Sequence, residues 1–287
     1  MKTDFTSMEE ELIENENIPL TSLFKEITRE IPSFHLISVI IPLYNEEKTI
    51  KNIIERIPDH QKYEIIIVND GSTDKSLEKV KEVTDRHIKI IEHEVNQGYG
   101  AAVLSGLSHA TGDIVVTLDS DGQHNPEEIP YLVKPILNNR ADITVGSRYL
   151  GKSNYKVPIY TRLGEYFVST WLKMLFKQSV CNNQSGFRAF NSNSLRIFKS
   201  LKHTTFGFCT ETLFEAAYNK LRICEVPILV NIRKYGTSHI KLFRILIAIC
   251  SCILTYLVKR FKLNRFIPGR ILAKIKNQIK LVIKKFT

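Results

Sequence analysis

The sequence predicts an α/β fold in which a mostly parallel sheet is flanked by helices. The first observation is a regular alternation that begins at Leu36, where helical stretches separate short β-branched runs that read LISVII, YEIIIV, IKII, DIVVTL and ADITVG. The second observation is that these runs are apolar on both faces, as expected of strands that helices cover on both sides. Ligands bind at the carboxyl ends of the strands in such sheets, so the residues after each run are the candidates for a site.

Polar, turn-forming residues follow four of the predicted strands. They read PLYNEE after the first run, NDGSTD after the second, DSDGQH after the fourth and SRY after the fifth. Taken alone, a stretch such as NDGS is an ordinary turn followed by a helix cap. Four such stretches at one edge of a sheet favour a binding site over four unrelated turns.

The distribution of charge argues against a nucleic-acid binder. The 287 residues carry a formal net charge of +10, but ten of the basic residues and none of the acidic ones lie between Lys259 and Thr287. The rest of the chain is neutral overall, and it lacks the folded face of cations and aromatic residues that is typical of nucleic-acid binding. The apolar content of 43% fits one large domain or two small ones with a sizeable core.

The cysteines and the N-terminal residues predict a cytoplasmic catalytic domain. The cysteines are odd in number and none is paired at the spacing of a zinc site: Cys181, Cys209, Cys224, Cys250 and Cys252. Unpaired thiols suit a reducing compartment. Residues 1–34 hold eight acids and three bases, with no cationic start before an apolar run, so we expect a mobile acidic leader and not an export signal.

Residues 241–287 are predicted to attach the protein to a membrane. The apolar run at residues 245–258 would rise about 21 Å as a helix, which is short of the roughly 30 Å hydrocarbon core. Polar residues recur along one stripe, as in a helix that lies in the membrane interface or packs one face on protein: Lys241, Arg244, Ser251, Thr255 and Lys259.

The last residues repeat this pattern with more charge. An isoleucine recurs at every fourth position from Ile267 to Ile283, and lysines surround these isoleucines. This pattern predicts a basic amphipathic helix on an anionic leaflet, with a soluble helix packed on the core as the alternative. We therefore expect three segments, a leader at 1–34, a catalytic domain at 35–240, and an interfacial helix with a basic tail at 241–287.

Asp119 and Asp121 form the strongest candidate for a metal site. On an extended chain these two side chains would point the same way and Ser120 the opposite way. Two carboxylates on one face suit Mg²⁺ or Mn²⁺, which takes its remaining ligands from water and from the phosphates of a substrate. Gln123 or His124 could complete the site, and such a metal would stabilise a diphosphate leaving group. The alternative is a solvated surface turn.

Several ordered motifs resemble one enzyme family. The stretches VIIPLYNEEKTI, IIIVNDGSTDKS, NQGYGAAVLSGLSHATGDIVVTLDSDGQHNPEEI, VGSRY and QSGFRAF resemble family 2 glycosyltransferases of the GT-A fold. The similarity is greatest to the dolichyl-phosphate mannosyltransferase and polyprenyl-phosphate glycosyltransferase branch, and it runs from about Ser38 to Lys241. It implies a nucleotide-sugar donor, a divalent metal and an acceptor that carries a phosphate.

The resemblance also implies roles for individual residues. The donor's base and ribose would be held by Pro42, Tyr44, Glu46 and Asp70, with Asp119 at the ribose and metal side. The metal would be held by Asp119, Asp121 and Gln123. The acceptor phosphate would be bound by Arg148 and Arg162, with Arg233 and Ser238 on a further motif, and Asp121, Arg148 and Arg162 are the expected catalytic residues. Arg188 and Glu211 also fall on family motifs.

Three positions depart from the family pattern. Asn182 replaces an aspartate shortly before SGFR, Asn69 replaces the first acid of a DDGS motif, and His239 replaces a lysine. Asn182 cannot accept a proton as a carboxylate would, although a sugar hydroxyl acceptor normally needs such a base. A phosphate monoester with a second pKa near ~6 is already largely ionised and needs none. A phosphate acceptor instead needs cations around it. The arginines expected on one lip of the site are Arg148, Arg162, Arg188 and Arg233. Of these, Arg188 is the one most suited to a structural role.

These observations predict an inverting, metal-dependent transfer of a hexose to dolichyl or polyprenyl phosphate at the cytoplasmic face of a membrane. The donor would be GDP-mannose or a UDP-hexose, and membrane lipids would be the other partner. An enzyme that extends a glycan or a lipid-linked sugar is one alternative, but it would need a base. A catalytically idle membrane scaffold is the other, and the intact acids Asp70, Asp119 and Asp121 argue against it.

Overall fold

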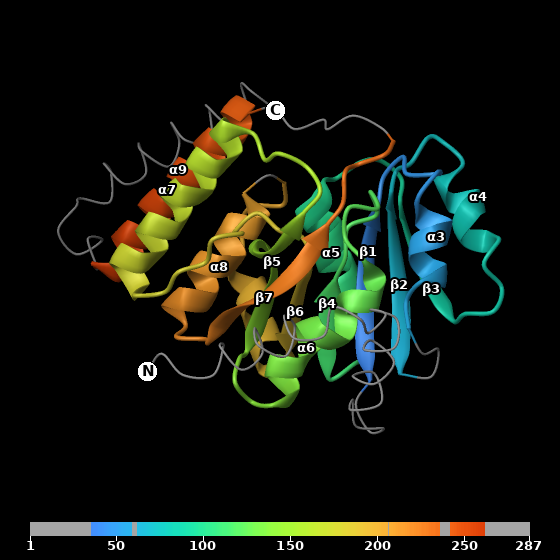
Figure 1. Ribbon diagram of the computed structural model, residues 1–287, viewed down its shortest axis with the longest axis horizontal. Helices are drawn as coiled ribbons and strands as arrows, with labels where there is room; N and C mark the ends of the chain where they lie inside the picture. The colour runs from blue at the N-terminus through green and yellow to red at the C-terminus, as the bar shows by residue number, and fades with distance from the viewer. Residues whose placement is uncertain (1–35, 59–61, 206, 236–241, 262–287) are drawn as a thin grey trace.

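The structure is a computed structural model that describes residues 36–58, 62–205, 207–235 and 242–261. The predicted leader at 1–34, the basic residues after Phe261, and Ser238 and His239 lie outside the described residues. The described chain forms a twisted sheet with helices on both faces, and further helices at one end (Figure 1).

The sheet has seven strands in the order β3-β2-β1-β4-β6-β5-β7. Their bounds are β1 Ile37–Leu43, β2 Tyr63–Asp70, β3 Ile88–His93, β4 Ile114–Thr117, β5 Ile143–Ser153, β6 Arg188–Asn191 and β7 Ile223–Val230. Every neighbouring pair is parallel except the two pairs that β6 makes, with β4 and with β5. The carboxyl ends of the six parallel strands therefore meet at one edge of the sheet, as the sequence predicts.

All five predicted strands are present, and two more were not predicted. β6 is only four residues long and pairs antiparallel between β4 and β5. β7 contains Pro227 and Glu225 and is only half buried, because it is the outer strand beside β5. Neither strand has the long apolar run of a central strand, so each depends on its neighbours in the sheet for its conformation.

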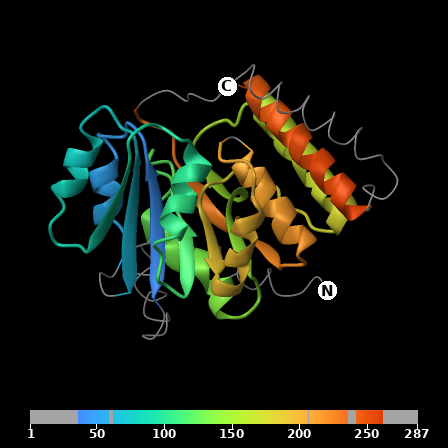
Figure 2. The same cartoon turned by 180° about the vertical axis from the view of Figure 1, so that it is seen from behind.

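Helices cover both faces of the sheet. Their bounds are α3 Ile50–Glu55, α4 Ser76–Lys81, α5 Tyr99–Leu107, α6 Ile129–Leu137, α7 Ile159–Phe176, α8 Phe208–Tyr218 and α9 Leu242–Arg260, with 3₁₀ turns at η1 Pro126–Glu128 and η2 Ser192–Ser200. Alternate residues of β1 face opposite layers, so that Val39 joins the core under α3 and α6 while Ile40 joins the core under α5. Figure 2 shows the sheet from the side that α5 and α8 cover.

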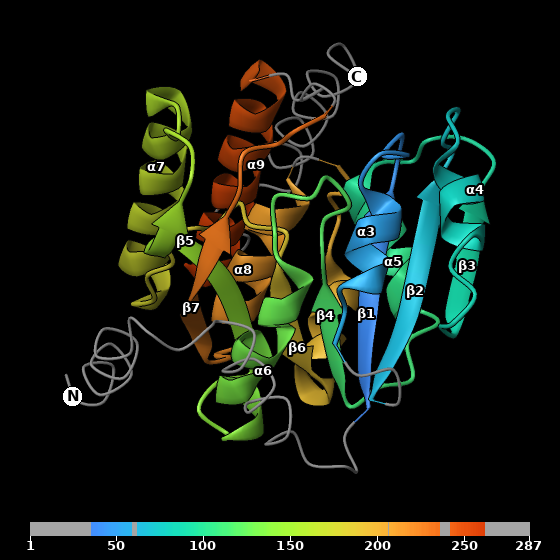
Figure 3. The same cartoon turned by 45° about the vertical axis from the view of Figure 1, so that its right-hand side comes forward.

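Two long helices form an outer layer at the β7 end of the sheet. α7 and α9 pack on each other and on α8, at the end of the molecule opposite α4 and β3 (Figure 3). α9 buries Ile249, Ile253 and Tyr256, and its Lys259 forms an ion pair of 2.7 Å with the buried Glu215 of α8. α9 therefore packs one face on protein, which the sequence left open as the alternative to an interfacial helix, and its contact with lipid stays a prediction.

None of the helices within the described residues is long and apolar enough to cross a bilayer.

Candidate active site

The loops after β1 and β2 are joined to each other at the carboxyl edge of the sheet. Asn45 has a positive φ of 54°, a conformation that asparagine tolerates, and its side-chain oxygen accepts a hydrogen bond of 2.8 Å from the backbone of Thr73. The backbone N–H of Asn45 donates to Ser72 Oγ at 3.1 Å. Because both loops share these bonds, the polar side chains that they carry keep fixed relative positions.

Glu46 is buried at this edge and faces Arg233, which follows β7. The Glu46 Oε1 accepts a hydrogen bond from Arg233 Nη2, and the backbone N–H of Glu46 donates to Ser76 Oγ at 2.7 Å. Burial raises the pKa of Glu46 to about 7, with Arg233 opposing the rise and Asp121 adding to it. A carboxylate and a guanidinium thus lie together where the sequence resemblance places the nucleotide.

Asp70 lies at the end of β2 and holds the loop that leads into α5. Its two carboxylate oxygens accept hydrogen bonds from the backbone N–H groups of Gln97, at 2.9 Å, and Gly98, at 2.8 Å. His93 Nδ1 lies 2.7 Å from the same carboxylate. Asp70 is only 3% exposed. It therefore shapes the site by fixing this loop, whatever contact it makes with a donor.

Of the other two residues predicted to hold the donor, one is buried and one is exposed. Pro42 is a buried residue of β1, paired in register with Val68 of β2. Tyr44 follows the strand and its side chain is exposed, in a position to stack on a planar ligand.

Asp119 lies against the backbone of Gly186 from the QSGFR stretch. A Cβ atom at position 186 would come within 2.1 Å of Asp119 Oδ1, so only glycine leaves room for this carboxylate. His124 Nδ1 is 3.5 Å from Asp119 Oδ2, and the hydroxyl of Tyr99 donates to the carbonyl of Gly186 at 3.5 Å. Burial raises the pKa of Asp119, an effect that His124 opposes and Asp121 reinforces.

Asp121 faces a different set of groups from Asp119. β4 ends at Thr117, and the chain then turns at Ser120 and Asp121 before Gly122, whose φ is 76°. The expectation of two acids on an extended chain is therefore wrong for the second acid, because Asp121 lies in the turn. Asp121 Oδ1 accepts a hydrogen bond of 3.0 Å from the backbone of Gln123, and Asp121 Oδ2 lies 3.9 Å from Arg233 Nη1.

Gln123 is anchored to the residue that follows β7. Its side-chain nitrogen donates to the carbonyl of Asn231 at 3.2 Å, and its own carbonyl accepts from the backbone of Asn231 at 2.8 Å. These bonds join the loop after β4 to the loop after β7. Gln123 therefore lies at the site, with its amide orientation set by Asn231.

The side chains at this edge suit a divalent cation that is shared with a substrate. Within the described ranges, no three His, Cys, Asp or Glu side chains gather as a metal cluster. Asp119 and Asp121 are nevertheless close enough that the charge of Asp121 helps to raise the pKa of Asp119, and the guanidinium of Arg233 lies beside Asp121. Two carboxylates beside an amide are hard oxygen donors of the kind that Mg²⁺ and Mn²⁺ accept.

Arg148 forms a separate charged cluster on β5. Its Nη2 donates to Glu165 Oε1 at 2.7 Å, its Nη1 donates to the hydroxyl of Tyr155, and the guanidinium lies 5.7 Å from the ring centroid of Tyr149. The hydroxyl of Tyr149 donates to the other oxygen of Glu165. Glu165 is buried and belongs to α7, so this helix determines where the guanidinium of Arg148 points.

The four arginines predicted for one lip of the site do not share one environment. Arg162 is exposed on the first turn of α7, near the cluster around Arg148. Arg233 lies instead with Glu46 and Asp121. Arg188 is 3% exposed and donates to the backbone carbonyls of Asn183, Ser185 and Cys209, so its expected place on the lip is wrong and the structural role is confirmed.

Glu211 is also structural. It is buried, and its Oε2 accepts hydrogen bonds from the backbone N–H groups of Lys202, at 2.8 Å, and His203, at 2.7 Å.

Asn182 is buried below the surface of the site. Its side-chain nitrogen donates to the carbonyl of Gly146 at 2.9 Å, and its backbone N–H donates to Glu225 Oε1 at 2.8 Å. A carboxylate in its place could not donate to that carbonyl and would lie near a second carboxylate. The amide nitrogen therefore matches its surroundings, whereas the amide oxygen of this buried side chain has no hydrogen-bond partner among the described residues, and the residue is 1% exposed.

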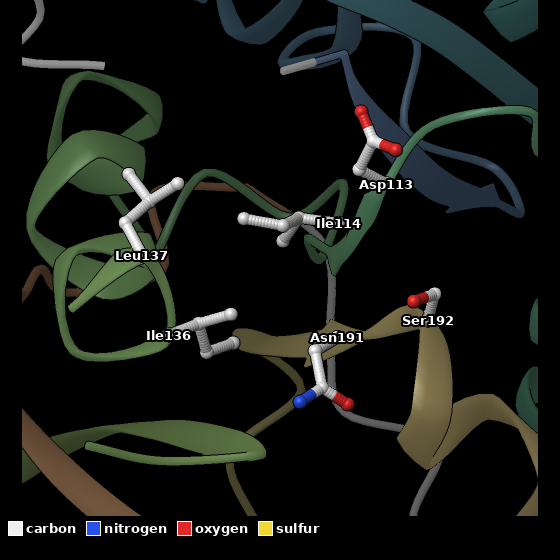
Figure 4. Close-up of a pocket in the computed structure, with 6 residues that line it drawn as sticks. All are labelled: Asp113, Ile114, Ile136, Leu137, Asn191 and Ser192. Carbon is white, nitrogen blue, oxygen red and sulfur yellow. The ribbon is translucent and has the colours of Figure 1, made fainter. Parts of the chain in front are cut away.

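Sequence reasoning did not identify Asn45, Glu165 or Gly186. Glu165 left one signal, because it is the only acid between residues 143 and 182. A pocket of about 260 Å³ lies elsewhere, at the amino end of β4, and its lining residues come from the start of β4 with the residue before it, the end of α6 and the junction of β6 with η2 (Figure 4). It is not part of the candidate site.

Comparison with known proteins identifies relatives over most of the chain. The sequence model named Glycosyl transferase family 2 matches residues 38–206. A UDP-N-acetylglucosamine–dolichyl-phosphate N-acetylglucosaminyltransferase of Methanococcus voltae is 36% identical over 223 residues, which cover 71% of this chain and 89% of that protein. A dolichol-phosphate mannosyltransferase of Pyrococcus furiosus is 33% identical over 215 residues, which cover 71% of this chain and 59% of that protein.

A solved structure shares the fold at lower sequence identity. It is glucosyl-3-phosphoglycerate synthase from Mycobacterium tuberculosis in complex with Mn²⁺, uridine-diphosphate-glucose and phosphoglyceric acid. The TM-score is 0.63 at 23% identity, and the match covers 80% of this chain and 83% of that chain.

Proposed function

Because the chain belongs to glycosyl transferase family 2, we propose that this glycosyltransferase moves a hexose from a nucleotide diphosphate sugar to dolichyl or another polyprenyl phosphate. The observation that carries the proposal is Arg148, which is oriented by the buried Glu165 and lies near the exposed Arg162. Two guanidinium groups suit a phosphate acceptor. The names of the relatives from Methanococcus voltae and Pyrococcus furiosus support the same class of acceptor.

In this proposal the loops after β1, β2 and β4 hold the donor. Pro42, Tyr44, Glu46 and Asp70 form the nucleotide side, and Asp119, Asp121 and Gln123 would hold Mg²⁺ or Mn²⁺. Such a cation supplies charge that stabilises the diphosphate leaving group. Arg233 is adjacent to Asp121, so it is placed to add positive charge on the same side.

The acceptor phosphate acts as its own nucleophile. One of its oxygens forms a bond to the anomeric carbon while the bond from that carbon to the nucleoside diphosphate breaks, and the diphosphate leaves with the bonding electrons. No proton has to be removed, because the phosphate is largely ionised near neutral pH. This chemistry fits the buried amide of Asn182, which offers no base. Attack from the side opposite the leaving group inverts the anomeric centre.

The proposal also assigns a place in the cell. The acceptor lipid requires a membrane, and we assign the enzyme to its cytoplasmic face because the sequence predicts a reducing compartment for the catalytic domain. Residues after Phe261 add positive charge that an anionic leaflet would attract. The membrane side is tested by protease accessibility of the enzyme in sealed vesicles of known orientation.

The deciding experiment is a transfer assay with separate donors. Full-length enzyme is incubated with polyprenyl phosphate, Mg²⁺ or Mn²⁺, and one labelled donor at a time, either UDP-N-acetylglucosamine, UDP-glucose or GDP-mannose. We expect one label to enter the organic phase as an acid-labile lipid-linked monophosphate sugar, and Asp121→Asn to abolish this. Transfer to a lipid-linked sugar but not to the free lipid phosphate would replace this function with glycan extension. No transfer from any donor would contradict it.

A further inference from the structure

Asp70 and His93 end two neighbouring strands and are paired in register. β2 and β3 run parallel, and their last paired residues are Asp70 and His93. Side chains that are paired in this way point to the same face of a sheet. His93 Nδ1 lies 2.7 Å from Asp70 Oδ1, and the side chains of His93 and Asp70 are 8% and 4% exposed. The register of the sheet therefore brings the two side chains together.

A third side chain completes this arrangement from a helix that packs on β2. Ser105 belongs to α5, and its Oγ lies 2.9 Å from His93 Nε2. An ionised carboxylate only accepts hydrogen bonds, so His93 Nδ1 donates to Asp70. In the neutral imidazole the other nitrogen is then an acceptor, and the hydroxyl of Ser105 donates to it. Ser105 therefore fixes the ring of His93, and His93 fixes the carboxylate of Asp70.

The same three residue types form the triad of serine hydrolases, but this group does not suit nucleophilic catalysis. A hydrolase also needs free backbone N–H groups beside the serine, which stabilise an oxyanion. Ser105 lies within α5, where the backbone N–H groups around it bond to carbonyls of the preceding turn. The role that remains for His93 and Ser105 is to position Asp70.

The protein itself uses most of the hydrogen-bonding capacity of Asp70. An ionised carboxylate offers about four lone-pair positions, two on each oxygen. Oδ1 accepts from His93 and from the backbone N–H of Gln97, and Oδ2 accepts from the backbone N–H of Gly98. Among the hydrogen bonds between described residues, these are the three that the Asp70 carboxylate accepts. One position on Oδ2 is therefore left for a ligand.

Backbone packing holds the loop after β3 in place around this carboxylate. Gly71 follows Asp70 with a φ of 71°, and a Cβ atom at Gly71 would come within 2.7 Å of the backbone nitrogen of Asn96. The loop after β3 thus packs directly on the turn after β2. Gln97 and Gly98 follow Asn96 in the same loop, so the N–H groups that they donate are fixed as well. The carboxylate is oriented before a nucleotide binds, which reduces the cost of binding.

A single free acceptor position distinguishes between uracil and guanine. Uracil presents one ring N–H between two carbonyl groups, and one carboxylate oxygen is enough to accept it. Guanine presents two parallel donors, its ring N–H and its amino group, and pairs best with both oxygens of a carboxylate. Because His93 and Gln97 already use Oδ1, guanine would leave one of these donors unpaired in a buried site, which costs binding free energy.

We propose that His93, held by Ser105, is a positioning residue that makes the nucleotide site selective for uracil over guanine. This inference rests on the proposed function, in which Asp70 belongs to the nucleotide side of the site, and it narrows the sugar donor to a uridine diphosphate sugar. His93 acts by occupying Asp70 Oδ1 and by directing the open position of Oδ2 toward the base. The base is remote from the reacting carbon, so His93 affects nucleotide binding and not the chemical step.

Nucleotide binding to the full-length wild type is the first test. UDP and GDP are titrated separately into the enzyme by isothermal titration calorimetry, at one Mn²⁺ concentration and without acceptor. We expect UDP to bind about tenfold or more tightly than GDP, which is the effect of one unpaired buried donor. Equal affinity, or tighter binding of GDP, would overturn this inference and leave the proposed transfer reaction standing. Binding of neither nucleotide would overturn both.

Substitutions of His93 test the mechanism of the selectivity. His93→Leu removes the hydrogen bond to Asp70 Oδ1, so UDP should bind about tenfold more weakly and the preference for UDP should narrow. His93→Asn keeps an N–H near the position of Nδ1 and should retain most of the wild-type affinity and preference. Unchanged binding by His93→Leu, or equal weakening by both variants, would overturn the positioning role. Circular dichroism verifies that each variant folds.

Ser105→Ala tests the outer member of the group. Alanine favours a helix more than serine does, so the change does not disturb α5 itself. His93 loses the partner of Nε2, and the preference for UDP should narrow, though less than in His93→Leu. A preference that stays at the wild-type value would overturn the role assigned to Ser105.

His87→Leu is the matched control for the substitutions of His93. His87 is exposed just before β3, at the opposite end of the strand, so this variant should bind both nucleotides as the wild type does. In the transfer reaction, His93→Leu should raise the KM for the nucleotide-sugar and leave kcat unchanged. A lower kcat with an unchanged KM would place His93 in the chemical step and overturn the proposal.

Discussion

The buried carboxylate of Glu165 holds the guanidinium of Arg148 at 2.7 Å, and it does so from a different element of the fold. Because Glu165 also accepts the hydroxyl of Tyr149, it connects the end of β5 to α7. Removal of this carboxylate would leave a buried arginine without its counter-charge.

Glu165→Ala should destabilise the protein by about 3 to 5 kcal/mol, which is typical of breaking a buried ion pair from one side. In the fraction that folds, the KM for polyprenyl phosphate should rise because Arg148 is no longer oriented, and the affinity for the donor should stay the same. Arg148→Ala should produce the same rise in KM. Unchanged acceptor kinetics in both variants would show that the pair is structural only.

Gly186→Ala should impair the enzyme through Asp119. The added Cβ would lie 2.1 Å from Asp119 Oδ1, so the carboxylate has to move. We expect kcat/KM to fall by about 100-fold, which is the cost of a displacement of about 1 Å at a reacting site. Binding of Mn²⁺ in the presence of donor, followed by electron paramagnetic resonance, should weaken as well.

Gly164→Ala is the matched control for that substitution. A Cβ at position 164 meets no atom within 4 Å, and the residue lies inside α7. This change should stabilise the helix by about 0.5 to 1 kcal/mol and leave kcat/KM at the wild-type value. Equal loss of activity in the two alanine variants would mean that the contact with Asp119 does not explain the effect.

Asn182→Asp should lower stability without a gain in rate. The aspartate cannot donate to the carbonyl of Gly146, and its charge would lie near Glu225, so we expect a loss of about 1 to 3 kcal/mol in the free energy of unfolding near pH 8. Because protonation relieves the charge, the loss should shrink toward pH 5. A rise in kcat would contradict the argument that the acceptor needs no base.

Glu128 should make stability depend on pH. Burial raises the pKa of Glu128 from 4.5 to about 7, an effect that the hydrogen bond from Leu229 N–H and the charge of Arg56 partly offset. A raised pKa means that the folded protein holds this proton more tightly than the unfolded chain does. The stabilisation is complete below about pH 4.5 and is lost as the pH rises through 7, with an upper size of about 3 kcal/mol.

The measurement for Glu128 is a comparison of urea unfolding curves between pH 4.5 and 8. As the pH rises, the free energy of unfolding of the wild type should fall relative to that of Glu128→Gln. Glutamine keeps an oxygen that can accept from Leu229 and has no proton to lose. Parallel pH profiles for the two proteins would assign the dependence to another group.

Much of the fold could be predicted because its central strands are continuous apolar runs. β1, β2 and β4 are buried on both faces, and that environment selects β-branched residues which are visible in the sequence. β6 and β7 could not be predicted in the same way, because one is four residues long and the other is a half-buried edge strand. Nothing in the local sequence of α7 indicated that the outer face of this helix would stay uncovered.

By itself, the sequence determined which edge of the sheet carries the site and which residue types gather there. Residues that follow parallel strands share one edge, so the positions of Glu46, Asp70 and Asp119 follow from the strand pattern alone. Only the tertiary structure decided which groups meet. Arg233 lies 187 residues from its partner Glu46, and Gly186, just before β6, lies against Asp119, just after the neighbouring strand β4. Such contacts depend on how distant segments of the chain pack. The local periodicity of a sequence indicates which face of a helix or strand is buried, but it does not indicate which element packs against that face.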